Sequence, residues 1–178
     1  VTIPGSVPAG VEVDFYGKLV SLAKQGGIPV IVDTSGALLA ETVKAKPTMI
    51  KPNTDEIGQL LGRRVQSRQE VIDAAWELHQ SGIPYVVVSL GKDGSVMACE
   101  EGIFQGITPD IPVVNTVGCG DSMVAGFAAA MARGKGPEEM LRLATAVSTA
   151  NALTMQTGHF EQEDLDRVLP LTAVKKIK

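Results

Sequence analysis

The chain has 178 residues, enough for one domain or most of one, and its 44% hydrophobic and 20% charged residues exclude intrinsic disorder. Sixteen lysines and arginines against twenty aspartates and glutamates give a formal net charge of −4, which argues against a general nucleic-acid or anionic-membrane binder. No apolar run approaches the roughly 20 residues that span a bilayer, and two cysteines, Cys99 and Cys119, form no disulfide framework, so we expect a cytoplasmic protein.

The chain opens without Met, and Val1-Thr2-Ile3 leads at once into Pro4-Gly5-Ser6, as if a strand had been cut open. We therefore expect a processed or truncated chain.

Short β-branched runs alternate with longer segments of helical period. The first helix is predicted from Asp14 to Gln25, with Phe15, Leu19 and Leu22 on its apolar face. Further predicted elements are strands at 30–33 and 48–50, helices at 36–44, 54–61 and 67–82, strands at 85–90 and 95–99 around a turn at 91–94, β-leaning stretches at 103–107 and 111–115, and helices at 122–133 and 137–153. This alternation predicts one α/β unit with a parallel or mixed sheet covered on both faces.

A glycine-rich turn precedes the helix predicted at 122–133. In Gly118-Cys119-Gly120-Asp121, two glycines flank a small residue, so successive N–H groups can turn toward one point at a partially positive helix N-terminus. This pattern predicts an anion hole suited to a phosphoryl group in transfer. Asp121 would repel that anion unless it takes a proton from an attacking hydroxyl. The alternative is that Asp121 caps the helix and the glycines serve the turn.

Two other segments have a plain local interpretation when they are taken alone. Asn53-Thr54-Asp55-Glu56 follows a buried strand and its Lys51-Pro52 stop, and indicates a helix that Asn53 caps, with Glu56 in its first turn. Val88 to Gly94 is typical of a strand end followed by an ordinary hairpin turn.

These segments resemble the ribokinase-like sugar kinases, also called the phosphofructokinase B family, and the resemblance extends over essentially the whole chain. It implies that Asp121 is the catalytic base and that the amides of Gly118, Cys119 and Gly120 stabilise the transferring phosphate. Cys119 stands where Ala or Ser is commoner, and is either a reactive thiol at a helix N-terminus or a small buried filler.

The same resemblance implies that Asn53 and Glu56 organise Mg²⁺ and its waters around the ATP phosphates. His79 and His159 lie outside the matched catalytic motifs, so we expect solvated or capping roles for them. The resemblance places Lys51, Ser89, Gly91, Gly94 and Asn151 around the nucleotide, with Asn151 and the stretch 156–159 near the adenine and a candidate monovalent-cation region.

The fold implied is a ribokinase-like three-layer αβα sandwich with a mostly parallel, Rossmann-like sheet. Residues 1–178 would be the C-terminal portion of a single kinase domain, with the N-terminal part and the β lid absent from this chain. The function implied is ATP-dependent phosphorylation of a ketohexose phosphate to the 1,6-bisphosphate. Thr157-Gly158-His159 favours the tagatose-6-phosphate kinase branch, and Ser122-Met123-Val124 favours 1-phosphofructokinase.

Several alternatives stay open at this point. The chain could belong to a kinase of the same family for another sugar or a nucleoside, or be a nucleotide-binding module without chemistry. A dinucleotide-binding domain is disfavoured, because the glycine turn lacks the third glycine of that fingerprint. The expected partners are ATP and a sugar phosphate, with neither nucleic acid nor membrane; a homodimer is left open.

Overall fold

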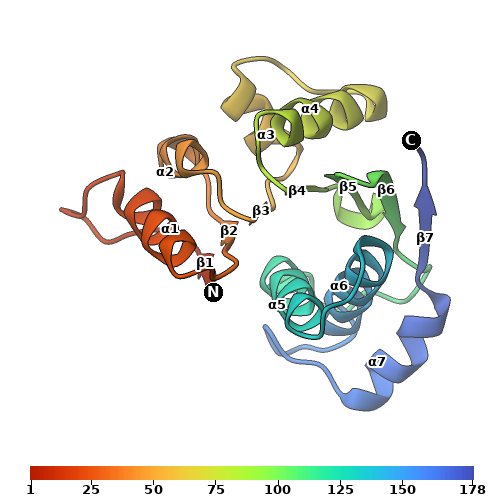
Figure 1. Ribbon diagram of the computed structural model, residues 1–178. Coiled ribbons are helices and arrows are strands. Elements are labelled where there is room, and N and C mark those ends of the chain that lie inside the picture. The colour runs from red at the N-terminus through yellow and green to blue at the C-terminus, as the bar shows by residue number, and fades with distance from the viewer. The chain divides into compact units, whose positions relative to one another are not determined.

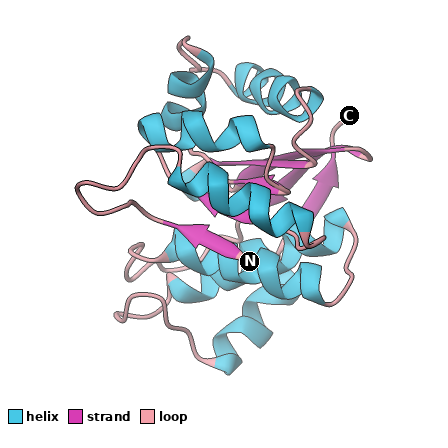
Figure 2. Ribbon diagram, turned by 60° about the vertical axis from the view of Figure 1, so that its left-hand side comes forward, coloured by secondary structure: helices cyan, strands magenta, loops and turns pink.

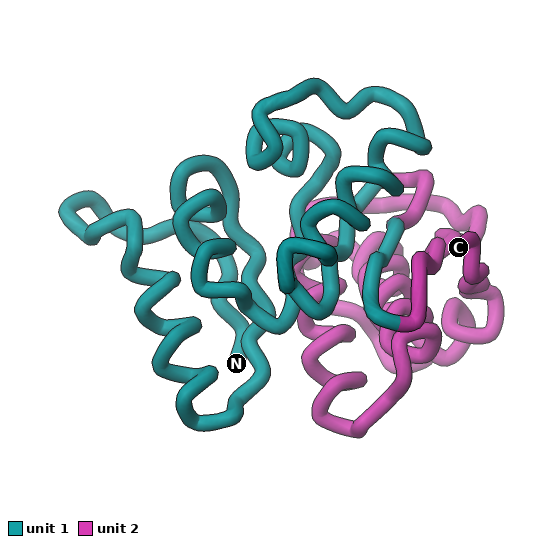
Figure 3. The backbone as a smooth tube through the Cα atoms, turned by 45° about the horizontal axis from the view of Figure 1, so that its top comes forward, with its two compact units in different colours: residues 1–90, 96–100 teal, residues 91–95, 101–178 magenta.

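The computed structural model describes residues 1–178, in which strands and helices alternate through most of the chain (Figures 1 and 2). The chain divides into two compact units, residues 1–90 with 96–100 and residues 91–95 with 101–178 (Figure 3). No helix has the length and apolar character needed to cross a membrane. The single-domain organisation expected from the sequence stays a prediction.

The first unit contains a parallel sheet in which each strand pairs with the next along the chain. β1 pairs with β2, β2 with β3 and β3 with β4, all in parallel. Helices fill the connections, as parallel pairing requires a crossover. The strands are β1 (Thr2–Pro4), β2 (Ile31–Asp33), β3 (Met49–Ile50) and β4 (Tyr85–Ser89); β5 (Ser95–Cys99) lies at the boundary of the units. The helices are α1 (Phe15–Gln25), α2 (Gly36–Thr42), α3 (Thr54–Leu61) and α4 (Arg68–Gln80), with a 3₁₀ turn η1 (Val43–Ala45) after α2.

The core of this unit follows from its continuous apolar strands. Val32, Ile50 and Val87 are fully buried, as expected for strands that are covered on both faces. Helix α1 departs from the sequence prediction, because its core contacts come from Tyr16 and Val20. The predicted apolar face of α1 is at least one-third exposed at Phe15, Leu19 and Leu22.

The second unit combines an antiparallel strand pair with three helices. β6 pairs antiparallel with β7, and α5 packs along α6. The packing is close at Gly126 of α5, where an added Cβ would lie 2.6 Å from the Cα of Ala144 in α6. The small residues of α5 thus serve a helix–helix contact. The elements are η2 (Gly91–Asp93), β6 (Gly102–Ile107), α5 (Cys119–Ala132), α6 (Pro137–Asn151), α7 (Gln162–Val168), η3 (Leu169–Leu171) and β7 (Ala173–Lys176).

One predicted element is absent. The β-leaning stretch 111–115 forms no strand. Pro112 offers no N–H for a strand ladder, while the N–H groups of Val114 and Asn115 both donate to the carbonyl oxygen of Ala152, at 2.8 and 3.2 Å. The chain is therefore held against the end of α6 as an irregular segment that leads into the glycine turn.

Candidate active site

The first unit places three predicted site residues at the carboxyl ends of its parallel strands. Lys51 and Asn53 follow β3, and Ser89 ends β4. Asn53 and Ser89 form an isolated parallel bridge, and the N–H of Ser89 donates to the carbonyl oxygen of Pro52 at 3.0 Å. This edge of an open parallel sheet is where α/β proteins bind ligands.

Lys51 is committed to an ion pair within this edge. Its side chain is 7% exposed, and Nζ lies 3.2 Å from Oδ2 of Asp33, the last residue of β2. A buried ammonium needs such a partner, because unpaired burial of a charge is costly. The pair joins the ends of two adjacent strands, so Lys51 has a structural role whatever it contributes to a nucleotide.

Asn53 and Glu56 form a reciprocal capping box at the start of α3. Oδ1 of Asn53 accepts from the N–H of Glu56 at 2.9 Å, and Oε2 of Glu56 accepts from the N–H of Asn53 at 2.8 Å. The helix-capping role that the sequence indicates for Asn53 is therefore present. Oε1 of Glu56 takes part in neither bond, and no cluster of three acidic, His or Cys side chains that could hold a metal occurs in the chain. The residues fit a magnesium ion that is held chiefly by phosphates and waters, which Mg²⁺ prefers.

The turn at 91–94 belongs to the second unit. Gly91 opens the 3₁₀ turn η2, and Gly94 lies against β6 with a φ of +85°. A Cβ at Gly94 would lie 2.0 Å from the carbonyl oxygen of Gly106, so only glycine fits there.

The 118–121 turn is the start of α5. Gly118 is the N-cap residue with a φ of +83°, and no side chain caps the helix. A Cβ at Gly118 would lie 2.6 Å from the backbone nitrogen of Gly158 and 3.0 Å from Cγ2 of Thr157. The turn is therefore pressed against the segment after α6, and Gly118 is required by both its conformation and its surroundings.

The backbone N–H groups of this turn differ in availability. The N–H of Cys119 donates to the carbonyl oxygen of Thr116 at 3.2 Å, and the N–H of Ser122 donates to that of Gly118 at 2.8 Å. The N–H groups of Gly118, Gly120 and Asp121 make no hydrogen bond in the structure. Unpaired N–H groups at a helix N-terminus are ready donors to an anion.

Asp121 is exposed in the first turn of α5, at its third residue. Its carboxylate makes no hydrogen bond or ion pair, and the N-cap position belongs to Gly118. The structural alternative in which Asp121 caps the helix is thus absent. A carboxylate without a partner beside unpaired N–H groups is available to take a proton.

Asn151, the last residue of α6, forms hydrogen bonds with the glycine turn at the start of α5. Its side chain is fully buried, and Nδ2 donates to the carbonyl oxygen of Val117 at 3.1 Å and to Sγ of Cys119 at 3.3 Å. Oδ1 of Asn151 is buried and has no partner. The structure therefore brings Asn151 together with the glycine turn, although the two are more than thirty positions apart in sequence.

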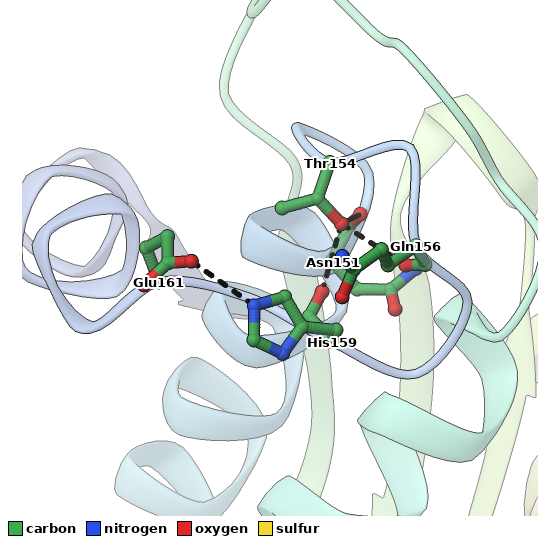
Figure 4. A network of polar contacts seen from close by, with 5 residues as sticks. All are labelled: Asn151, Thr154, Gln156, His159 and Glu161. Carbon is green, nitrogen blue, oxygen red and sulfur yellow. Dashed lines mark hydrogen bonds and ion pairs between the residues drawn. The ribbon is translucent and has the colours of Figure 1, made fainter.

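A polar network continues from Asn151 into the following loop (Figure 4). Oγ1 of Thr154 lies 3.0 Å from the carbonyl oxygens of both Gln156 and His159, and 3.3 Å from that of Asn151. Nε2 of His159 lies 3.1 Å from Oε1 of Glu161, on the surface. His159 therefore pairs locally, and several carbonyl oxygens converge around one hydroxyl.

Sequence reasoning overlooked two residues that shape these sites. Asp33 received no role, although it ends β2 and pairs with Lys51. Asn115 also received none, but its Oδ1 accepts from the N–H of Val117 at 3.0 Å and its Nδ2 donates to the carbonyl oxygen of Met155 at 3.0 Å. An Asn that bonds the N–H two residues on is typical of turns, so its position before Thr116-Val117-Gly118 was an available signal.

Comparison with known proteins gives one family. The family model of the pfkB family carbohydrate kinases matches residues 1–164. Tagatose-6-phosphate kinase of Staphylococcus epidermidis is 39% identical over 167 residues, which are 92% of this chain and 54% of that protein.

Solved structures of a phosphofructokinase are also similar to this chain. Phosphofructokinase-2 of Escherichia coli in complex with potassium superposes with a TM-score of 0.90 at 33% identity, over 95% of this chain and 55% of that one. The same enzyme in complex with fructose-6-phosphate has a TM-score of 0.85 at 32% identity, and its tetrameric inhibited form one of 0.86 at 33%, each over 95% of this chain and 55% of that one.

The chain belongs to the pfkB family of carbohydrate kinases. The α/β fold expected from the sequence is confirmed, and the family resemblance is confirmed with it. The chain spans about half the length of the relatives that it matches.

Proposed function

We propose that the protein containing this chain transfers the γ-phosphate of ATP to the free primary hydroxyl of a ketohexose phosphate. The observation that carries the proposal is the start of α5, where an exposed carboxylate without a partner, Asp121, stands beside unpaired N–H groups. In this role Asp121 takes the hydroxyl proton as the oxygen attacks, and the N–H groups of Gly118 and Gly120 receive the charge of the transferring group. Cys119, whose N–H is engaged in the turn, contributes its small volume and conformation.

We assign Lys51 and Ser89 of the first unit, and Gly91, Gly94 and Asn151 of the second unit, to the nucleotide. A bound magnesium ion would neutralise phosphate charge; Asn53 and Glu56 would hold its waters, since their capping box leaves only part of their oxygens available. The carbonyl oxygens around Thr154 are of the kind that bind a monovalent cation. This loop is therefore a candidate site for such a cation.

The substrate class is a ketohexose phosphate with a free C1 or C6 hydroxyl. A relative named tagatose-6-phosphate kinase and a phosphofructokinase solved with fructose-6-phosphate support this class. Tagatose 6-phosphate and fructose 1-phosphate are the two substrates that the sequence favours, and phosphorylation of either yields a 1,6-bisphosphate. Cytoplasmic location and homodimer formation are further expectations.

The test is ADP release by the full-length protein, measured with MgATP and separately with tagatose 6-phosphate, fructose 1-phosphate and fructose 6-phosphate. Turnover with one of them at least 100 times above the rate with ATP alone is expected. Turnover only with a nucleoside or an unphosphorylated sugar would replace the substrate class. Nucleotide binding without turnover on any acceptor would leave a non-catalytic binding module.

A further inference from the structure

The thiol of Cys119 stands at the first position of α5, inside the turn proposed to receive the transferring phosphate. Cys119 is partly exposed, whereas the other cysteine, Cys99, is fully buried. The sulfur of Cys119 lies 3.3 Å from Nδ2 of Asn151 and 4.0 Å from the carbonyl oxygen of Asn115. The two cysteines of one chain thus differ sharply in access to solvent.

The buried amide of Asn151 is an independent observation at the same place. Its side chain is fully buried, Nδ2 is used twice, and Oδ1 is buried without any partner. A buried acceptor that lacks a donor is costly, so such a group indicates a missing O–H or N–H. Oδ1 shares its carbon with the nitrogen that contacts Sγ, so the unpaired acceptor belongs to the same amide that already binds the sulfur.

We infer that Cys119 is a site of reversible oxidation by a hydroperoxide, and that its sulfenic acid, held by Asn151, closes the anion site. The inference rests on the proposed function, since it regulates the same turn. In the reaction the sulfur attacks one peroxide oxygen; an S–O bond forms and the O–O bond breaks. The thiol proton goes to the departing oxygen, which leaves as water or an alcohol. Sulfur loses two electrons and the peroxide gains them.

The surroundings favour both the attack and its product. Reactive cysteines are typically found at helix N-termini and beside polar donors, and Cys119 has both surroundings. Once oxidised, the O–H of the sulfenic acid can donate to Oδ1 of Asn151. The added oxygen also enlarges the first side chain of the turn whose Gly118 and Gly120 N–H groups the phosphate would use, and this would hinder phosphate binding. One low-molecular-weight thiol reacts with the sulfenic acid to form a mixed disulfide and water. A second thiol then attacks this disulfide, which restores the Cys119 thiol and releases a disulfide of the small thiol.

The experiment treats the full-length protein with hydrogen peroxide in the presence of dimedone, and quantifies the labelled peptides of both cysteines by mass spectrometry. Affinity for a non-hydrolysable ATP analogue is measured in parallel without dimedone, before oxidation, after it, and after a thiol is added. We expect Cys119 to be labelled at least ten times faster than Cys99. Nucleotide affinity should fall at least tenfold on oxidation and recover with the thiol.

Two variants sharpen the result. In Cys119→Ala, nucleotide affinity should be insensitive to peroxide relative to the same variant untreated. In Asn151→Ala, labelling of Cys119 should slow at least threefold. If that variant does not fold, the ratio of the labelling rates of Cys119 and Cys99 in the unaltered protein still tests the inference. Labelling of Cys119 no faster than that of Cys99, or oxidation without loss of nucleotide affinity, would overturn the inference. Peroxide-sensitive nucleotide binding in a protein without turnover would instead overturn only the proposed kinase reaction.

Discussion

Replacing Gly118 by Ala tests whether the turn before α5 is held by its surroundings as well as by its own conformation. Gly118 has a φ of +83°, and an added methyl group would lie 2.6 Å from the backbone nitrogen of Gly158. Gly134 offers a matched control, since its φ is +64° and nothing lies within 4 Å of an added Cβ. The two substitutions share the conformational strain, and only the first adds a steric clash with backbone.

The strain of a left-handed non-glycine residue costs roughly 1–2 kcal/mol. Overpacking against atoms that cannot move adds about 1–3 kcal/mol. Gly118→Ala should therefore cost about 2–5 kcal/mol and Gly134→Ala about 1–2 kcal/mol, or melting temperatures lower by roughly 4–20 °C and 2–8 °C in a chain of this size. Thermal and urea denaturation followed by circular dichroism measures both. Equal destabilisation by the two substitutions would refute the packing of this turn against 157–158.

Gly126→Ala places a methyl group 2.6 Å from a backbone Cα atom of α6, so stability should fall by about 1–3 kcal/mol; an unchanged urea midpoint would contradict the close helix contact. Lys51→Met leaves the mostly buried Asp33 without its ammonium partner, and should cost up to about 3 kcal/mol, measured in the same way; a neutral result would deny the ion pair a structural role. Hydrogen bonds from the N–H groups of Ser67 and Gln66 lower the pKa of Glu70 in the folded protein. The charged carboxylate therefore stabilises the fold fully at pH values above the ordinary pKa of 4.5. This contribution is lost as the pH falls through the lowered pKa of the folded state. The stability difference between the protein and Glu70→Gln should accordingly shrink at acid pH, and a difference that is constant with pH would contradict this.

Helix starts were the most predictable features, because their signals lie within four consecutive residues. Ser67 with Glu70 forms the capping box that its spacing indicates, and Asn53 with Glu56 forms one where capping was the alternative to a metal role. Strand β4 was predictable for a similar reason, since a run of valines between turn residues is typical of a strand covered on both faces.

Features that depend on distant partners could not be predicted. The stretch 111–115 has β propensity, but its N–H groups bond to Ala152, which no local pattern reveals. The apolar face of α1 was chosen by helical spacing, yet which face is buried depends on what packs against the helix, and Tyr16 and Val20 are buried instead.

The candidate site was predictable in part. The glycine turn and its aspartate were recognisable as a motif, and the structure adds that Asp121 is without a partner. The contact of Asn151 with this turn is a tertiary feature, because it joins residues that are 34 positions apart. The ion pair of Lys51 with Asp33 likewise depends on strands that are adjacent only in the folded sheet.

We propose Asp121 as the base that deprotonates the attacking hydroxyl. Its most direct test is the turnover of Asp121→Asn in the full-length protein, with nucleotide affinity measured alongside. Asp110→Asn is the matched control, because Asp110 is an exposed carboxylate of the same unit outside the turn.

We predict that Asp121→Asn lowers turnover by about 10²–10⁴-fold, the usual contribution of a general base, while nucleotide affinity stays within a few-fold and Asp110→Asn retains the parent rate. Near-normal turnover in Asp121→Asn would show that Asp121 is not the general base.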